Sequence, residues 1–137
     1  MSYDLAAAVT NLQTLILTIA SDINAAPDAS PESINQFPFS LVYIKEFRTL
    51  GGSYGWDEIV DTIVIEIHLT RQNLPGAYAA ALPYRTEIFE KLIADPTLGG
   101  TVDTMVDFRG AFGGLTYSGE QHIGWQMELD VKGKVTI

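Results

Sequence analysis

Two histidines, and the carboxylates that alternate with them along two predicted strands, are the residues best suited to chemistry. His68 lies two residues after Glu66, and His122 lies six residues before Glu128. Neighbouring strands of one sheet would bring these four side chains together, and imidazole and carboxylate groups are ligand types for a metal and partners in acid–base catalysis. Their spacings match no metal-binding signature. A solvated or subunit-facing polar patch is therefore the favoured interpretation.

Other signatures of catalysis are missing from the sequence. The chain has no cysteine, which excludes a disulfide framework and thiolate metal ligands. No serine stands in the context of a nucleophile elbow. The glycine-rich stretch 51–55 is followed neither by Lys-Ser/Thr nor by the start of a helix, so it does not predict a phosphate-binding loop. We therefore predict a protein that is not an enzyme, with no catalytic residue, no cofactor and no metal.

Composition limits the class of protein further. A length of 137 residues predicts a single domain over 1–137, large enough to bury about 65–70% of the surface of its unfolded chain. Eight basic and seventeen acidic residues give a net charge of −9, and the basic ones are scattered. Tight binding of nucleic acid needs clustered Lys and Arg, so we expect this surface to repel DNA. Ordinary solubility charge is the alternative explanation.

Targeting and membrane segments are not expected from the sequence. No apolar run approaches the roughly 18 residues that predict a membrane-spanning helix. The first lysine or arginine is Lys45, so the N-terminus lacks the basic region that begins a secretory signal.

Two helices are predicted from apolar residues at spacings of three and four. The first covers 2–23, with Ser2 as its N-cap and Asp4 in its first turn. The second covers 77–94 and ends at an Asp-Pro pair. Pro83 removes one backbone hydrogen bond inside this second helix, so we expect the helix to be kinked or split there.

Four strands are predicted from alternating side chains and β-branched residues, at 40–47, 58–70, 101–108 and 122–131. The order α-β-β-α-β-β predicts an α+β fold, a mainly antiparallel four-stranded sheet with both helices packed on one face. The opposite face is expected to be polar or available to a partner. Its predicted members are Glu66, His68, Gln126, Glu128 and Asp130.

Long connections separate several of these elements. The segment 24–38 contains three prolines and is expected to be a surface connector. The loop 48–57 is longer than a hairpin needs, and the glycine-rich loop 109–119 either closes a wide hairpin or extends as an arm. Aromatic residues contribute strongly to binding, so these loops are candidates for partner contact, although Tyr54 and Trp56 folded back onto the core is an equal alternative. The predicted partner-interface residues are Leu50, Tyr54, Trp56, Phe112 and Tyr117.

A family resemblance enters in the last two thirds of the chain. The residues that carry it are the stretch ADPTLGGTV at 94–102, a glycine-rich loop with Tyr117, and HIGWQMEL at 122–129. In this order they resemble the tail terminator (tail completion or neck) proteins of tailed bacteriophages. The resemblance is one of pattern and includes no catalytic signature.

The resemblance implies a structural role in the virion. Tail terminators assemble as a ring, generally a hexamer, which caps the tail tube, stops its polymerisation and joins it to the head-side connector or stopper protein. It implies contacts with copies of this chain, with the tail tube protein and with the connector, while DNA passes through an acidic lumen without specific binding. Assembly would take place in the host bacterial cytoplasm. Glu66, Glu128 and Asp130 are the residues expected to face the lumen.

Two alternatives stay open at this point. One is another tail or neck component, such as a tube protein or a connector stopper. The other is a small acidic α+β enzyme or ligand-binding module, which would be monomeric or dimeric and would have a concave pocket with shifted titratable groups.

Overall fold

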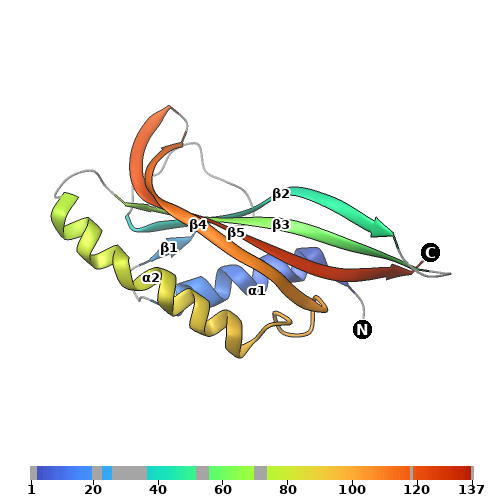
Figure 1. Ribbon diagram of the computed structural model, residues 1–137. Coiled ribbons are helices and arrows are strands. Elements are labelled where there is room, and N and C mark those ends of the chain that lie inside the picture. The colour runs from blue at the N-terminus through green and yellow to red at the C-terminus, as the bar shows by residue number, and fades with distance from the viewer. Residues whose placement is uncertain are drawn as a thin grey trace.

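Four long antiparallel strands form the sheet of this protein, which we describe from a computed structural model (Figure 1). The structure describes residues 3–19, 23–25, 37–51, 56–69, 74–117 and 119–136. In chain order the elements are α1 (Leu5–Leu17), β1 (Asn24–Ala25), β2 (Phe39–Gly51), β3 (Trp56–Leu69), α2 (Leu74–Ala94), β4 (Thr104–Tyr117) and β5 (Glu120–Thr136).

The strand order is β1-β2-β3-β5-β4, and the long strands are antiparallel to their neighbours. The two-residue strand β1 adds a short parallel pairing at the beginning of β2. The predicted α+β class, with four antiparallel strands in the order α-β-β-α-β-β, is confirmed. Along the rest of β2 and along β4, the outer edges have no strand partner within the described ranges.

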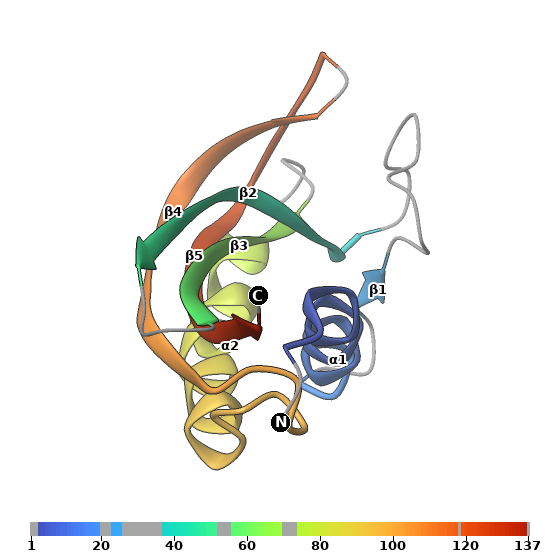
Figure 2. The same cartoon turned by 90° about the vertical axis from the view of Figure 1, so that its right-hand side faces the viewer.

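Both helices lie on one side of the sheet (Figure 2). Helix α1 buries one stripe of its surface and α2 buries another, and both pack against alternate residues of β3 and β5. This alternation is the one that the sequence predicts for β5, where every second residue is apolar. The fully buried members of the core include Leu12, Ile16, Ile63, Ile65, Ile67, Ile88, Leu92, Met127 and Leu129.

The opposite, helix-free face is not uniformly open, because the sheet curls at one end. Tyr117 at the end of β4 packs against Phe39 and Leu41 at the beginning of β2. In the strand order β3 and β5 separate these two strands, so contact between them requires the sheet to bend over its own helix-free face. In Figure 1 the β4–β5 hairpin rises away from the helices at this end.

The first helix is shorter than predicted. It begins after Asp4, whose side chain accepts a hydrogen bond from the backbone N–H of Ala7, so Asp4 is the N-cap. It ends at Leu17 rather than at residue 23. The predicted N-cap, Ser2, lies outside the described residues.

The second helix, predicted to be kinked or split at Pro83, is continuous from Leu74 to Ala94, so the predicted split is wrong. Pro83 is exposed, so the carbonyl that loses its helical N–H partner is on the solvent side of α2. Tertiary packing of the buried stripe on both sides of Pro83 holds the helix together.

Two predicted loops are largely strand. Residues 48–51 continue β2 and residues 56–57 belong to β3, so the loop predicted at 48–57 is reduced to 52–55, which lie outside the described residues. The glycine-rich loop predicted at 109–119 is the second half of β4, paired with β5 up to Tyr117↔Glu120. The predicted connector 24–38 contributes β1. The last strand, predicted to end at 131, continues to residue 136 in β5.

Candidate functional site

A chain of hydrogen bonds joins two histidines and two carboxylates on the helix-free face. His68 Nδ1 lies 2.9 Å from His122 Nδ1, and His68 Nε2 lies 2.7 Å from Glu66 Oε1. The other ring nitrogen of His122, Nε2, lies 3.3 Å from Glu120 Oε2. Both imidazoles are buried, whereas Glu120 is half exposed. The sequence predicts this face for both histidines, and the register of β3 against β5 confirms it.

The protons in this chain can be assigned from its donors and acceptors. An ionised carboxylate only accepts, so His68 Nε2 donates to Glu66. The contact between the two Nδ1 atoms needs one donor and one acceptor, so one of these two nitrogens carries a proton and the other does not.

Glu66 also joins side chains of the two strands next to β3 to this network. Its Oε2 atom accepts hydrogen bonds from the Tyr43 hydroxyl on β2 and from Gln126 Nε2 on β5 at 3.3 Å. Burial raises the pKa of Glu66, but hydrogen bonds from His68 and Tyr43 outweigh it and hold the pKa below the usual value. Burial and the Glu66 carboxylate raise the pKa of Tyr43, so this hydroxyl stays a donor.

Aromatic side chains cover the two histidines. The ring of Phe37 contacts His122 edge-on at 5.0 Å between centroids, and Tyr117 contacts His68 in the same manner at 5.9 Å. Beside this cover lies a hollow of about 320 Å³, which is lined by Leu41, Tyr43, Glu66, Thr116 and Tyr117. The prediction that the histidines form a solvated patch is wrong, because the curled sheet encloses them within one chain.

A second charged cluster lies further along the same face, centred on Arg109 of β4. Its guanidinium contacts Asp107 at 2.8 Å, Asp130 at 3.1 Å and Glu128 at 3.3 Å. Lys45 from the opposite edge strand reaches Glu128 at 2.9 Å. Burial raises the pKa of Asp130, but hydrogen bonds from Thr62 and Arg109 lower it by more. The pKa of this carboxyl is therefore below its usual value.

The two clusters divide the four residues that the sequence groups together. His68, His122 and Glu66 are in contact, whereas Glu128 belongs to the Arg109 cluster. Within the described part of the chain, no three His, Asp or Glu side chains are placed to hold a metal ion. None of its buried side-chain nitrogen or oxygen atoms lacks a hydrogen-bond partner. Together the two clusters connect β2, β3, β5 and β4 through side chains that serve as hydrogen-bond partners for one another.

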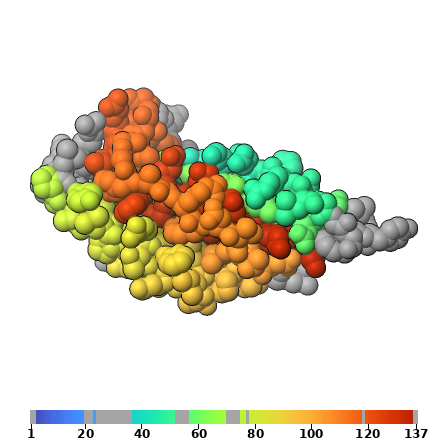
Figure 3. Space-filling view, in the orientation of Figure 1, coloured from blue at the N-terminus to red at the C-terminus, as the bar shows by residue number. Residues whose placement is uncertain are grey.

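Exposed apolar side chains gather along two other parts of the molecule. The first, the β2 flank, consists of Ile44, Phe47 and Leu50, and Phe47 is 69% exposed. The second, the α2–β4 flank, consists of Tyr78, Leu82, Phe89 and Ile93 on one stripe of α2, together with Val106 of β4. Figure 3 shows α2 and β4 side by side on one surface, with β2 beyond β5.

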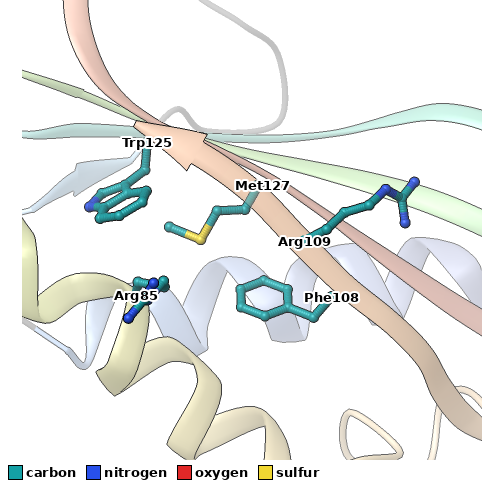
Figure 4. Close-up of a pocket in the computed structure, with 6 residues that line it drawn as sticks. Arg85, Phe108, Arg109, Trp125 and Met127 are labelled. Carbon is teal, nitrogen blue, oxygen red and sulfur yellow. The ribbon is translucent and has the colours of Figure 1, made fainter. Parts of the chain in front are cut away.

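The α2–β4 flank contains a hollow of about 220 Å³ (Figure 4). Tyr78 on Phe112 and Phe89 on Phe108 form two aromatic contacts between the helix and β4. Between the two phenylalanines on β4 lies Gly110, where a Cβ atom would lie 2.5 Å from the carbonyl oxygen of Gln126, so β4 and β5 approach each other closely there. The hollow is lined by Arg85, Phe108, Arg109, Gly110, Trp125 and Met127, and Arg109 points away from it.

The predicted partner-interface residues have different surroundings. Leu50 is exposed on the β2 flank. Phe112 and Tyr117 are half-buried, because Phe112 packs on Trp125 and Tyr117 packs over His68. Tyr54 and the side chain of Trp56 lie outside the described residues, so their predicted roles stay predictions.

The predicted lumen residues are similarly divided. Glu66 and Asp130 are buried within the chain, whereas Glu128 is partly exposed. Whether any of them faces a lumen stays a prediction.

Sequence reasoning did not single out Phe47, Arg85 or Tyr43. Phe47 falls at the end of a predicted strand, where alternation gives no indication of exposure. Arg85 had a detectable signal, because it is the one cation on the otherwise apolar stripe 78, 82, 89 and 93 of the second helix. Tyr43 becomes recognisable only when its strand is paired with Glu66 of β3.

No protein-family model matches this chain, and no curated protein sequence matches it. Within the described residues, neither helix is long and apolar enough to cross a membrane.

Proposed function

We propose that this protein is a structural subunit of a bacteriophage tail that acts as a tail terminator. In this proposal, copies of the chain form a closed ring, a hexamer as the resemblance implies. The ring caps the tail tube, stops its polymerisation and offers its other side to the head-side connector. The observation that carries the proposal is the presence of two different exposed apolar flanks, one on β2 and the other on α2 and β4.

Two unlike surfaces favour a head-to-tail contact between copies. If the β2 flank of one copy packs on the α2–β4 flank of the next, every contact in the assembly is the same. Each copy then contributes its β2 flank to one contact and its α2–β4 flank to another. Such heterologous contacts produce a ring when the rotation between copies closes. Exposed large apolar residues that cluster on a small domain are typical of surfaces covered in an assembly.

The open sheet edges support the same arrangement. Unpaired N–H and C=O groups along an edge strand are a template for pairing with another chain, and soluble monomers usually protect them. Within the described residues, β4 forms one edge of the sheet, and β2 forms the opposite edge beyond its short pairing with β1; both strands are long. Contact between a β2 edge and a β4 edge would satisfy these backbone groups and would bring the two flanks together.

The charge of the protein agrees with a bore that DNA passes through. A net charge of −9 without a basic cluster opposes the counterion exchange on which DNA binding depends. Glu66 and Asp130 are committed to partners inside the chain. Of the three predicted lumen residues, Glu128 is therefore the one best able to present charge to the bore.

The mass of the purified protein as a function of concentration tests this proposal. A terminator should reach one finite mass, a small multiple of 15.0 kDa, and negative-stain images should show rings. A tube protein would instead polymerise without limit under the same conditions. A chain that stays monomeric at every concentration would contradict the proposed function.

A further inference from the structure

We infer that the His68–His122 pair is a proton-dependent latch that holds the tip of the β4–β5 hairpin over the helix-free face. The tip consists of the described residues 113–117 and 119–122. This inference concerns a conformational device within one chain and does not depend on the proposed function.

The tip extends beyond the end of its neighbouring strand. The last described pair between β3 and β5 is Leu69↔Ile123, so His122 is the first residue of β5 past it. Beyond that point, the pairs within the described residues join β4 and β5 to each other, at Leu115↔His122 and the two pairs that follow. Side-chain contacts therefore connect the tip to the rest of the described sheet, and the bond between the two Nδ1 atoms is among them.

The backbone at the base of the tip is adapted to bending. Gly113 and Gly114 follow each other in β4, and Gly113 pairs with Gly124 of β5. A Cβ atom on Gly113 or Gly114 would meet no atom within 4 Å, so packing does not require glycine at these two positions. Consecutive glycines without such a requirement lower the cost of changing the backbone angles.

The protons on the two Nδ1 atoms determine whether these atoms can bond. At their separation of 2.9 Å, one Nδ1 donates and the other accepts. Protons on both Nδ1 atoms would place two N–H groups against each other at this short distance. The rings must then separate, and Tyr117 and Phe37, which contact them, lose their packing surface.

The charged and titratable groups around the pair come from four strands. Glu66 of β3 and Glu120 of β5 face the outer ring nitrogens, Tyr117 of β4 contacts His68, and Tyr43 of β2 acts through Glu66. With a single proton between the Nδ1 atoms their bond is intact whether or not Glu120, which is half exposed, stays in contact with His122. The latch therefore opens only when both Nδ1 atoms carry protons, which a fall in pH favours.

Hydrogen exchange of the full chain, followed by mass spectrometry and expressed as protection factors, tests the latch. On lowering the pH from about 7.5 to about 5, protection of the tip amides should fall about tenfold or more, while amides of β3 and central β5 keep theirs. His122→Asn places a neutral amide donor near the Nδ1 position, so its tip protection should not depend on pH. Glu90→Gln, an exposed change on α2, should behave as the wild type does.

Three results would overturn the inference. Wild-type tip protection could stay constant over this range, or it could fall together with that of β3, which would indicate global unfolding. His122→Asn could also show the same pH dependence as the wild type. A nitrogen-15 NMR spectrum of the histidine rings gives an independent measurement, since the inference requires that one of the two Nδ1 atoms carries no proton at about pH 7.5.

Discussion

Glu66 is the residue on which the helix-free face depends most, because it accepts hydrogen bonds from side chains of three strands. Glu66→Gln keeps the volume but replaces one acceptor oxygen by a donor, so Tyr43 or His68 loses its acceptor. We expect the free energy of unfolding to fall by about 1–3 kcal/mol, measured by urea denaturation. Glu90→Gln on the exposed side of α2 is the matched control and should change stability by less than about 0.5 kcal/mol. Equal effects of the two changes would contradict this role.

Acid sensitivity is expected from the same residue and from Asp130. The folded protein lowers the pKa of both carboxyl groups. Their ionised forms therefore contribute stability that is present above the unfolded pKa of about 4 and is lost as the pH falls through the lower folded values. Stability measured from pH 6 to pH 2 should decline in this lower window, and Glu66→Gln with Asp130→Asn should flatten the decline. An unchanged pH profile in that double variant would disprove the assignment.

The faces of these residues are predictable from the sequence, but their burial is not. Alternation along β3 and β5 places Glu66, His68 and Asp130 opposite the apolar stripe, and the register confirms this. The burial of Glu66 and His68 depends on Tyr117 of β4 reaching the Phe39 region of β2 across two intervening strands. No local pattern encodes a contact between non-adjacent strands, so the sequence predicts a solvated face.

At the scale of elements, the central strands β3 and β5 approach each other closely at Gly124, opposite His68. Gly124 of β5 leaves no room, because a Cβ atom there would lie 1.8 Å from the carbonyl oxygen of Ile67. On its other side, its β4 partner Gly113 has open space around it. We expect Gly124→Ala to lower the free energy of unfolding by about 3 kcal/mol or more, since β3 and β5 must separate. Gly113→Ala should leave the free energy of unfolding nearly unchanged. Thermal melts of both variants measure this, and a similar loss of stability in both would contradict the close approach.

Element boundaries differ from the sequence prediction mainly where glycine is abundant. The segment 109–117 reads as a loop because it contains three glycines, yet it pairs with β5 along its length. Glycine lowers strand propensity, but cross-strand pairing with a well-formed neighbour outweighs that preference. The first helix shows the opposite error, because its apolar residues continue to Ile19 while the regular helix ends at Leu17.

At the scale of the whole molecule, the two apolar flanks differ in kind, and this difference distinguishes head-to-tail from symmetric association. One flank is a strand with Phe47 protruding, and the other is a helix stripe that includes Ile93, which is 58% exposed. A symmetric dimer would use one flank twice. A head-to-tail assembly uses each flank once, so a copy with one damaged flank can still offer the other.

Two variants that each damage one flank therefore give a prediction for the proposed ring. Phe47→Asp and Ile93→Asp should each be monomeric at concentrations where the wild type is assembled, because either change places a charge in every contact. Mixed in equal amounts, they should form a one-to-one dimer and no ring, since one intact β2 flank meets one intact α2–β4 flank. Sedimentation velocity of each variant and of the mixture measures this, with thermal melts to verify folding. A dimer formed by either variant alone would mean that association is symmetric and that the head-to-tail ring is wrong.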